Sequence, residues 1–127
     1  MARILVVDDE PHVTRLVQQR LRSAGYEVDT ARNGLEAISC IEASDYAAIV
    51  TDYNMPGMDG RQLVEWVRKE RAGQDIGIYL VTARLEERVR TWAEGLPSVD
   101  YIEKPLSLRD LIARLESRFR KAEARDA

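Results

Sequence analysis

The sequence predicts a doubly wound α/β domain, with a five-stranded parallel sheet and five helices on its two faces. Three runs are apolar at almost every position, as in strands covered on both faces: Ile4–Val7, Ala47–Val50 and Ile78–Val81. Two mixed runs, Tyr26–Thr30 and Val99–Ile102, are typical of edge strands. Helical patterns fill the gaps. Right-handed crossovers between successive strands then favour the strand order 2-1-3-4-5.

Most of the predicted helices have a recognisable start or stop. Pro11 suits the first turn of the first helix, and Gly25 ends that helix. Asn33, Asp59 and Ser107 are expected to cap the second, third and fifth helices by accepting hydrogen bonds from free backbone N–H groups. The apolar stripes expected to face the sheet are, in chain order, Val13, Leu16, Val17, Leu21 and Ala24; Leu35 and Ile38; Leu63, Val64 and Val67; Leu85, Val89, Trp92 and Ala93, followed by Gly95; and Leu108, Leu111, Ile112, Leu115 and Phe119.

Length, composition and net charge narrow the class of protein to which this chain can belong. The 127 residues, 45% hydrophobic and 32% charged, suit one domain over residues 1–122, with 123–127 as a tail or the start of a linker. A net charge of −3 gives no electrostatic reason to expect nucleic acid or an anionic membrane as a partner. The single cysteine, Cys40, cannot form an internal disulfide, and the N-terminal apolar run is too short for a signal peptide or membrane span. We therefore expect a cytoplasmic domain.

Polar side chains collect where the predicted strands end. Asp8 and Asp9 follow the first strand, and Asp52 follows the third. In an open α/β sheet the functional crevice lies beyond the carboxyl ends of the strands, where the strand order reverses. That point falls between the first and third strands. Thr82 ends the fourth strand and Lys104 follows the fifth, so both are expected in the same region.

Clustered carboxylates repel one another, so at neutral pH they must be protonated or neutralised. Mg²⁺ held by two or three carboxylates, with waters completing an octahedron, is the expected solution. Lys104 adds positive charge and Thr82 adds a hydroxyl donor, which suits a phosphoryl group. Asp52 is then the expected nucleophile. Separately these residues could be helix-start acids, a strand-end hydroxyl and a solvated charge, but their convergence favours a site.

Several segments match a known signalling family. They are "ILVVDDEP", "DYNMPGMDG", "YLVTA" and "YIEKP", with "ARNGLEAI" as weaker support. On these segments the chain resembles a response-regulator receiver domain of two-component signalling, similar to the chemotaxis regulators, over residues 3–120. The resemblance implies a flavodoxin-like fold, which is the doubly wound sheet that the strand and helix pattern predicts.

The resemblance also implies roles for the carboxylates. Asp52 would accept a phosphoryl group from a sensor histidine kinase or phosphotransfer protein, with the domain catalysing its own phosphorylation and slow dephosphorylation. Asp9, Asp52 and the backbone carbonyl of Asn54 would bind Mg²⁺. Asp8 would act on the metal mainly through water. The output partner or domain is not implied, and a phosphorylation-dependent homodimer is compatible with the resemblance.

The remaining implied roles concern the switch. Lys104 and the backbone N–H of Ala83 would contact the phosphoryl group, and the Lys104–Pro105 bond would be cis. Thr82 would move toward a phosphoryl oxygen, and Tyr101 would turn inward beside it. The fourth helix, the last strand and the fifth helix would then form the face that changes its partner binding.

Three other functions are weighed against this one. A haloacid-dehalogenase-type phosphatase is an Mg²⁺-dependent enzyme with an aspartyl nucleophile, but it carries an acid/base Asp where this chain has Asn54. A flavin-binding module of the same fold would find an acidic loop after its first strand, which repels a phosphate. A receiver used only for docking would need a broken acidic set, whereas this set is complete.

One stretch departs from the family pattern. Relatives commonly read like "AGADDY" before the last strand, whereas this chain reads "EGLPSVDY". The fourth helix is expected to start early and to leave a longer loop containing Pro97. Since this loop borders the expected output face, the partner cannot be inferred from the family.

Four further side chains are interpreted individually. His12 is expected on the exposed flank of the first helix, because imidazole is a poor ligand for Mg²⁺. Trp66 is expected on a partly buried flank and Trp92 in the core, and Cys40 is expected to be an inert helix residue.

Overall fold

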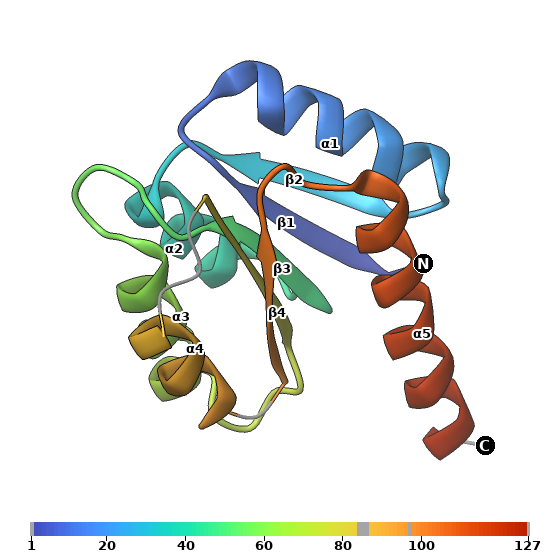
Figure 1. Ribbon diagram of the computed structural model, residues 1–127. Coiled ribbons are helices and arrows are strands. Elements are labelled where there is room, and N and C mark those ends of the chain that lie inside the picture. The colour runs from blue at the N-terminus through green and yellow to red at the C-terminus, as the bar shows by residue number, and fades with distance from the viewer. Residues whose placement is uncertain (1, 84–86, 97, 127) are drawn as a thin grey trace.

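The computed structural model describes residues 2–83, 87–96 and 98–126 and shows a five-stranded sheet between two layers of helices (Figure 1). In chain order the elements are β1 (Arg3–Val7), α1 (Pro11–Ser23), β2 (Glu27–Ala31), α2 (Gly34–Ala43), β3 (Ala48–Asp52), α3 (Gly60–Glu70), β4 (Gly77–Thr82), α4 (Glu87–Glu94), β5 (Val99–Glu103) and α5 (Leu108–Asp126). Among the described residues, no helix is both long and apolar enough to cross a membrane.

The sheet has the predicted topology. Its strands are all parallel and follow the order β2-β1-β3-β4-β5, with β2 and β5 at the edges. In the centre Ile4 of β1 lies opposite Ala48 of β3, and Val50 of β3 lies opposite Tyr79 of β4. Strands β3 and β4 are buried along their whole length, which explains their continuous apolar sequences.

A hydrophobic core lies on each face of the sheet. The core on the side of α2 and α3 includes Leu5, Ile49 and Leu80. The core on the side of α1 and α5 includes Val6 and Tyr79, because neighbouring residues of a strand point to opposite faces. Figure 1 shows α1 and α5 covering one face, while α2, α3 and α4 cover the other. The doubly wound architecture is therefore confirmed.

The predicted capping residues lie at the helix starts. Asn33 Oδ1 accepts the Glu36 N–H at 2.8 Å, and Ser107 Oγ accepts the Asp110 N–H at 3.1 Å. Asp59 forms a reciprocal capping box with the third residue of α3, Gln62. These bonds satisfy backbone donors that the helices leave free and so fix where each helix begins.

Three residues assigned to buried stripes are exposed. Leu16 of α1 is 54% exposed and Leu35 of α2 is 69% exposed, and Ala24 lies in the exposed cap of α1. The faces that pack on the sheet are Thr14–Val17–Leu21 in α1 and Gly34–Ala37–Ile41 in α2. Leu16 and Leu35 are each one residue, or about 100° of helix rotation, away from a residue on those faces. The apolar pattern was misread because a threonine and a glycine face the core.

Thr14 can take its buried place because its hydroxyl is satisfied locally. Thr14 Oγ1 donates to the Pro11 carbonyl at 2.9 Å. A buried hydroxyl with a hydrogen-bond partner costs little, so the stripe can include a polar residue without an obvious sequence signal.

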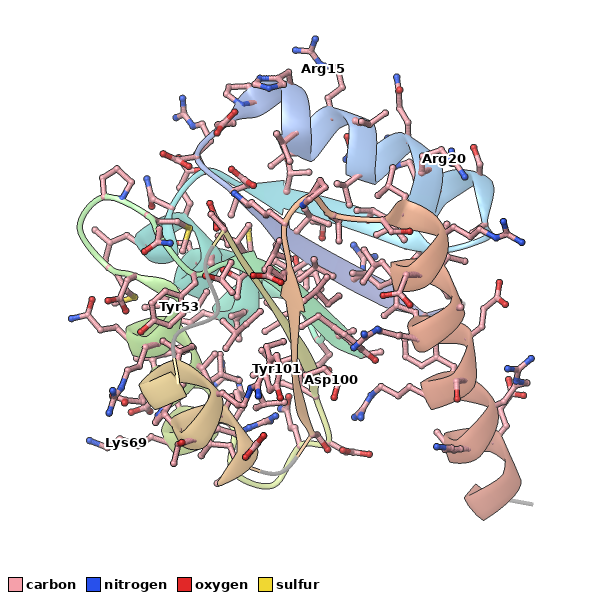
Figure 2. The ribbon with its side chains drawn as sticks, viewed as in Figure 1. Arg15, Arg20, Tyr53, Lys69, Asp100 and Tyr101 are labelled. Atoms are coloured by element: carbon pink, nitrogen blue, oxygen red, sulfur yellow. The ribbon has the colours of Figure 1, made fainter. Side chains whose placement is uncertain are left out.

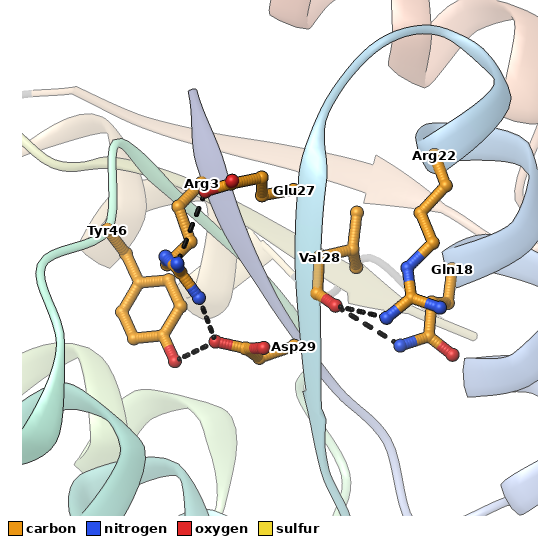
Figure 3. A network of polar contacts seen from close by, with 7 residues as sticks. All are labelled: Arg3, Gln18, Arg22, Glu27, Val28, Asp29 and Tyr46. Carbon is orange, nitrogen blue, oxygen red and sulfur yellow. Dashed lines mark hydrogen bonds and ion pairs between the residues drawn. The ribbon is translucent and has the colours of Figure 1, made fainter. Parts of the chain in front are cut away.

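A polar network ties β2 to the neighbouring elements (Figure 3). Asp29 Oδ2 accepts hydrogen bonds from Arg3 at 3.1 Å and from the Tyr46 hydroxyl at 2.7 Å. Arg3 also pairs with Glu27 at 3.2 Å. Burial and the neighbouring Asp29 carboxylate raise the pKa of Tyr46, so its hydroxyl stays protonated and donates. This network was not predicted from the sequence.

The outer edge of β2 is covered in part by α1. The Val28 carbonyl accepts hydrogen bonds from the Gln18 side-chain amide and the Arg22 guanidinium, both at 3.1 Å (Figure 3). Capping of this carbonyl leaves fewer backbone groups of the edge strand free to pair with another chain.

The predictions for α4 are confirmed in part. Val89 and Ala93 are buried as expected, whereas Trp92 is only partly buried at the margin of the core. Leu85 and Pro97, on which the early helix start and the longer loop depend, lie outside the described residues.

Candidate functional site

The candidate site begins with Asp52, which ends the central strand β3. The residue is 5% exposed, and the Tyr53 N–H beyond it continues the sheet by donating to the Val81 carbonyl at 2.8 Å. Gly60 then closes the β3–α3 loop, because its N–H donates to the Tyr53 carbonyl at 2.8 Å. The loop is thereby held against the strand, and the backbone that carries Asp52 is fixed on both sides of the sheet edge.

Gly60 has a packing role that the sequence analysis missed. A Cβ at this position would lie 2.8 Å from the Asp52 carbonyl oxygen and from Tyr53 Cα. Only glycine lets the start of α3 approach the strand this closely. A glycine at the first position of a helix, just after the residue that caps it, is the sequence signal that could have indicated such an approach.

Three carboxylates converge at this end of the sheet. Asp8 and Asp9 follow β1, and Asp52 ends β3. One carboxylate oxygen from each of the three residues lies within 4.8 Å of the other two. Asp8 is 6% exposed, whereas Asp9 lies on the surface. The predicted convergence of sequence-distant acids at the strand-order reversal is therefore seen in the structure.

The Asp52 carboxylate is only half satisfied. Its Oδ2 accepts a hydrogen bond from Lys104 Nζ at 3.3 Å. Its Oδ1 is buried and has no hydrogen-bond partner in the described part of the chain. Burial raises the pKa of Asp52 above its ordinary value, and this effect outweighs the opposing influence of Lys104 and of the nearby Asn54 backbone amide. The carboxylate is thus poised to accept a further positive or electrophilic group.

Asp8 is in a similar position. Its Oδ1 accepts the Glu10 backbone N–H at 3.0 Å, which the sequence analysis did not foresee. Burial, followed by repulsion from Asp52 and Asp9, raises the pKa of Asp8, although the Glu10 amide and Lys104 oppose the change. Two buried carboxylates therefore lie close together, and the ammonium group of Lys104 lowers the pKa of both.

This donor set fits Mg²⁺. The ion prefers oxygen ligands and keeps several waters, so a few carboxylates at an open edge are sufficient. Asp8, Asp9 and Asp52 supply such oxygens, and the orphaned Asp52 Oδ1 is a buried acceptor suited to a cation. Asn54, the other predicted ligand, is exposed on the loop that follows β3, and its role stays a prediction.

The other predicted site residues border the same edge. Thr82 is 1% exposed at the end of β4, and its carbonyl accepts the Lys104 backbone N–H at 2.7 Å. Ala83 follows it at the surface. The Lys104–Pro105 peptide bond is cis, as the family resemblance implies.

Tyr101 lies farther out on β5. Its ring packs partly buried at the margin of the core, and its hydroxyl donates to Glu94 Oε1 of α4 at 3.2 Å. Figure 2 shows Tyr101 on β5 in the region of α4. The inward turn expected of Tyr101 stays a prediction.

A largely apolar cavity of about 340 Å³ adjoins the carboxylates. It runs between α1 and the β5–α5 loop, and Asp8, Asp52 and Lys104 line one part of it. The exposed Leu16 and the nearby Leu106 line the rest together with other apolar side chains. The misassigned Leu16 is therefore part of a surface beside the candidate site.

Three side chains outside the carboxylate cluster, His12, Trp66 and Cys40, also carried individual predictions. The His12 side chain is 77% exposed and its Nε2 lies 3.2 Å from Glu10, so it lies on the exposed flank of α1 as predicted. Trp66 is partly buried, also as predicted. Cys40 is a partly buried free thiol, and burial raises its pKa, which disfavours the reactive thiolate.

A comparison with protein families identifies the same segments. The family model described as response regulator receiver domain matches residues 4–116. Transcriptional regulatory protein TcrA of Mycobacterium tuberculosis is 34% identical over 119 residues, covering 94% of this chain and 46% of TcrA. Transcriptional regulatory protein ResD of Bacillus subtilis is 37% identical over 120 residues, covering 94% of this chain and 49% of ResD. The chain thus spans about half the length of these curated relatives.

Solved structures share the fold over nearly the whole chain. A CheY-like response regulator receiver domain protein from Methanospirillum hungatei superposes with a TM-score of 0.89 at 28% identity, covering 98% of both chains. The response regulator protein TrrA of Thermotoga maritima, solved in complex with Mg²⁺ and BeF, gives a TM-score of 0.80 at 33% identity, covering 92% of this chain and 98% of TrrA.

Proposed function

This chain belongs to the response regulator receiver domain family, and from this premise we propose that Asp52 accepts a phosphoryl group from a phosphohistidine. The donor would be a sensor histidine kinase or a phosphotransfer protein. One observation carries the proposal: the Asp52 Oδ1 is buried without a hydrogen-bond partner in the described part of the chain, beside two further carboxylates and Lys104. An oxygen in such a place would be free to act as the nucleophile, with Lys104 and a bound cation offsetting the added charge.

The proposed transfer is a direct displacement at phosphorus. An Asp52 carboxylate oxygen forms a bond to phosphorus as the bond from phosphorus to the donor imidazole nitrogen breaks. The imidazole leaves with the electron pair of that bond and takes up a proton from water. Bound Mg²⁺ would offset the negative charge of the phosphoryl oxygens.

The side chains of this domain would orient the phosphoryl group. Lys104 Nζ, already 3.3 Å from Asp52 Oδ2, would pair with one oxygen of that group. Asp8, Asp9 and the Asn54 backbone carbonyl would hold Mg²⁺ with Asp52. The Ala83 N–H, at the end of β4, would donate to another phosphoryl oxygen.

The phosphodonor would approach through the cavity between α1 and the β5–α5 loop, because that cavity opens onto Asp52 and Lys104. The exposed Leu16 gives it an apolar contact, and α1 contains arginines but no acidic residue. Figure 2 shows Arg15 and Arg20 on the outer side of α1. We therefore propose that the phosphodonor protein contacts α1 through a surface with apolar residues at its centre and acidic residues around them.

Phosphorylation would shift the face formed by α4, β5 and α5. A phosphoryl group adds about −1.5 to −2 charges, and Thr82 would move to donate a hydrogen bond to it. The Tyr101 hydroxyl would then release Glu94, and the Tyr101 side chain would turn inward into the space that Thr82 leaves. Arg90, Asp100 and other charges of both signs on this face would allow a phosphorylation-dependent homodimer.

The names of the relatives suggest which process the phosphorylated domain would control. TcrA and ResD are named transcriptional regulatory proteins, and the matched region is about half of each. We propose that this domain controls transcription through a separate domain or partner and does not itself bind nucleic acid. No observation favours the phosphatase alternative, because Asn54 stands where its acid/base carboxyl would be needed.

Incubation with Mg²⁺ and acetyl phosphate, followed by intact-protein mass spectrometry, tests the phosphoacceptor. The wild type should gain one phosphoryl group, and Asp52→Asn should gain none. Asp59→Asn is the matched control, because Asp59 lies on the same loop but caps α3, and it should still be phosphorylated. Equal labelling of the Asp52 variant would overturn the assignment.

A further inference from the structure

Helix α4 is attached to β5 by side chains. Besides backbone packing on β5, Glu94 accepts the Tyr101 hydroxyl at 3.2 Å. The Arg90 guanidinium also lies 5.9 Å from the centroid of the Tyr101 ring. In the proposed switch the Tyr101 hydroxyl leaves Glu94, so this arrangement would be the resting position of α4.

A second attachment reaches α4 from α3. The Arg61 guanidinium lies over the ring of Trp92, 5.1 Å from its centroid, at a distance typical of a cation–π interaction. Arg61 is also fixed on its own helix, since its Nε donates to Glu65 Oε1 at 2.9 Å. Trp92 is partly buried at the margin of the core, so Arg61 covers the side of α4 that faces α3.

The backbone next to Arg61 is in direct contact with the end of β3, the strand that carries Asp52. The preceding residue, Gly60, packs against the Asp52 carbonyl and donates its N–H to the Tyr53 carbonyl. The capping box of Asp59 fixes the same turn. Arg61 therefore projects from a turn that is packed and hydrogen-bonded to β3, so a movement of α4 relative to α3 would change the distance between Arg61 and Trp92.

The two attachments hold different sides of α4. Trp92 and Glu94 are two residues apart, which places them about 200° apart around the helix. Movement of α4 away from its resting position would have to break or stretch both contacts. We propose that Arg61 is a positioning residue that restrains α4 in the resting state through Trp92, and so limits how readily the domain switches. This inference rests on the proposed function, in which the state of Asp52 is coupled to α4.

A restraint of this kind has a measurable consequence at the distant site. If α4 must leave Arg61 in the switched state, removal of the guanidinium favours that state. By linkage, ligands that favour the switched state then bind more tightly. A cation–π contact of ordinary strength corresponds to a change of about two- to fivefold. The contact lies on the surface, so it can be removed without opening the core.

The test is titration of the Mg²⁺-loaded protein with beryllofluoride, a phosphoryl mimic, followed by ¹⁹F NMR. We expect Arg61→Gln to bind it about two- to fivefold more tightly than wild type, and Arg61→Lys to fall between them. Arg71→Gln is the matched control, because Arg71 makes the same kind of contact with Trp66 of α3, its guanidinium 5.8 Å from the ring centroid, and also donates to the Ile41 carbonyl of α2. Its affinity should equal that of the wild type.

A double mutant separates a restraint on α4 from a local change at the pocket. In a Thr82→Ala background, which removes the proposed link to α4, Arg61→Gln should no longer raise the affinity. An unchanged or weaker affinity of Arg61→Gln, or the same gain in the Thr82→Ala background, would overturn the inference. Equal binding of beryllofluoride by wild type and Asp52→Asn would instead refute the proposed function, so the two failures are distinct.

Discussion

Two groups of acidic residues on the same sheet differ in how well they are satisfied. On β2, Asp29 Oδ2 accepts hydrogen bonds from both Arg3 and Tyr46. At the end of β3, Asp52 has one bond to Lys104 and one buried oxygen without a partner in the described part of the chain. The Asp29 side chain is 39% exposed and that of Asp52 is 5% exposed, so the less accessible carboxylate is also the less satisfied one.

The difference shows where this fold accepts a cost in stability. A buried polar atom without a hydrogen-bond partner loses the favourable free energy of its hydration. A hydrogen bond within the protein compensates for most of that loss. Asp29 has two hydrogen-bond donors on one oxygen, whereas burial raises the pKa values of Asp8 and Asp52 and so disfavours their charged forms unless positive charge is placed beside them. We expect the first group to stabilise the fold as it is and the second to gain stability when a cation binds.

The largest expected effect concerns the frame of the pocket. Gly60→Ala should lower the free energy of unfolding by about 1–3 kcal/mol, because the added Cβ would meet the backbone at Asp52 and Tyr53. Gly73→Ala is the control, since Gly73 lies in an exposed turn where an added Cβ would meet no atom within 4 Å. Urea denaturation measures both, and an equal loss in the two variants would show that the pocket frame is not specially rigid.

A smaller loss is expected in the satisfied network. Tyr46→Phe removes the hydroxyl that donates to Asp29 and should lower the free energy of unfolding by about 1 kcal/mol. The phenylalanine keeps the buried ring, so the loss reports the hydrogen bond rather than a cavity. The same urea experiment measures this effect. A variant as stable as the wild type would mean that the network contributes nothing and that the contrast with Asp52 is unfounded.

The smallest effect is expected for an exposed charge pair. Arg32 pairs with Glu36 at 3.1 Å, but the Arg32 side chain is 74% exposed. Exposed pairs gain little in water, so Arg32→Gln should leave the urea midpoint unchanged within error. A clear loss of stability would show that surface charges matter as much here as the partly buried network does.

The sequence predicted the elements whose signals are local. The continuous apolar strands, the caps at Asn33, Asp59 and Ser107, and the edge strands all follow from neighbouring residues, and the structure confirms them. The gathering of Asp8 and Asp52 also followed, because parallel strands bring their carboxyl ends to one edge.

Tertiary packing decided the features that were missed. Leu16 and Leu35 looked like core residues, but the rotation of each helix on the sheet placed smaller residues inside. The Asp29 network was not predicted because its partner Tyr46 is 17 residues away and belongs to no local motif. The contact between Arg61 and Trp92 was missed for the same reason, since it joins two helices through side chains alone.

The most direct test of this contrast compares Asp8→Asn and Asp29→Asn in melting experiments, each with and without saturating Mg²⁺. Without metal, Asp8→Asn should melt about 2–4 °C above wild type, because one repelling charge is removed, while Asp29→Asn should melt below it. Mg²⁺ should stabilise wild type and Asp29→Asn alike, and Asp8→Asn less. An Asp8→Asn variant that melts below wild type without metal, or that gains as much from Mg²⁺, would contradict the account.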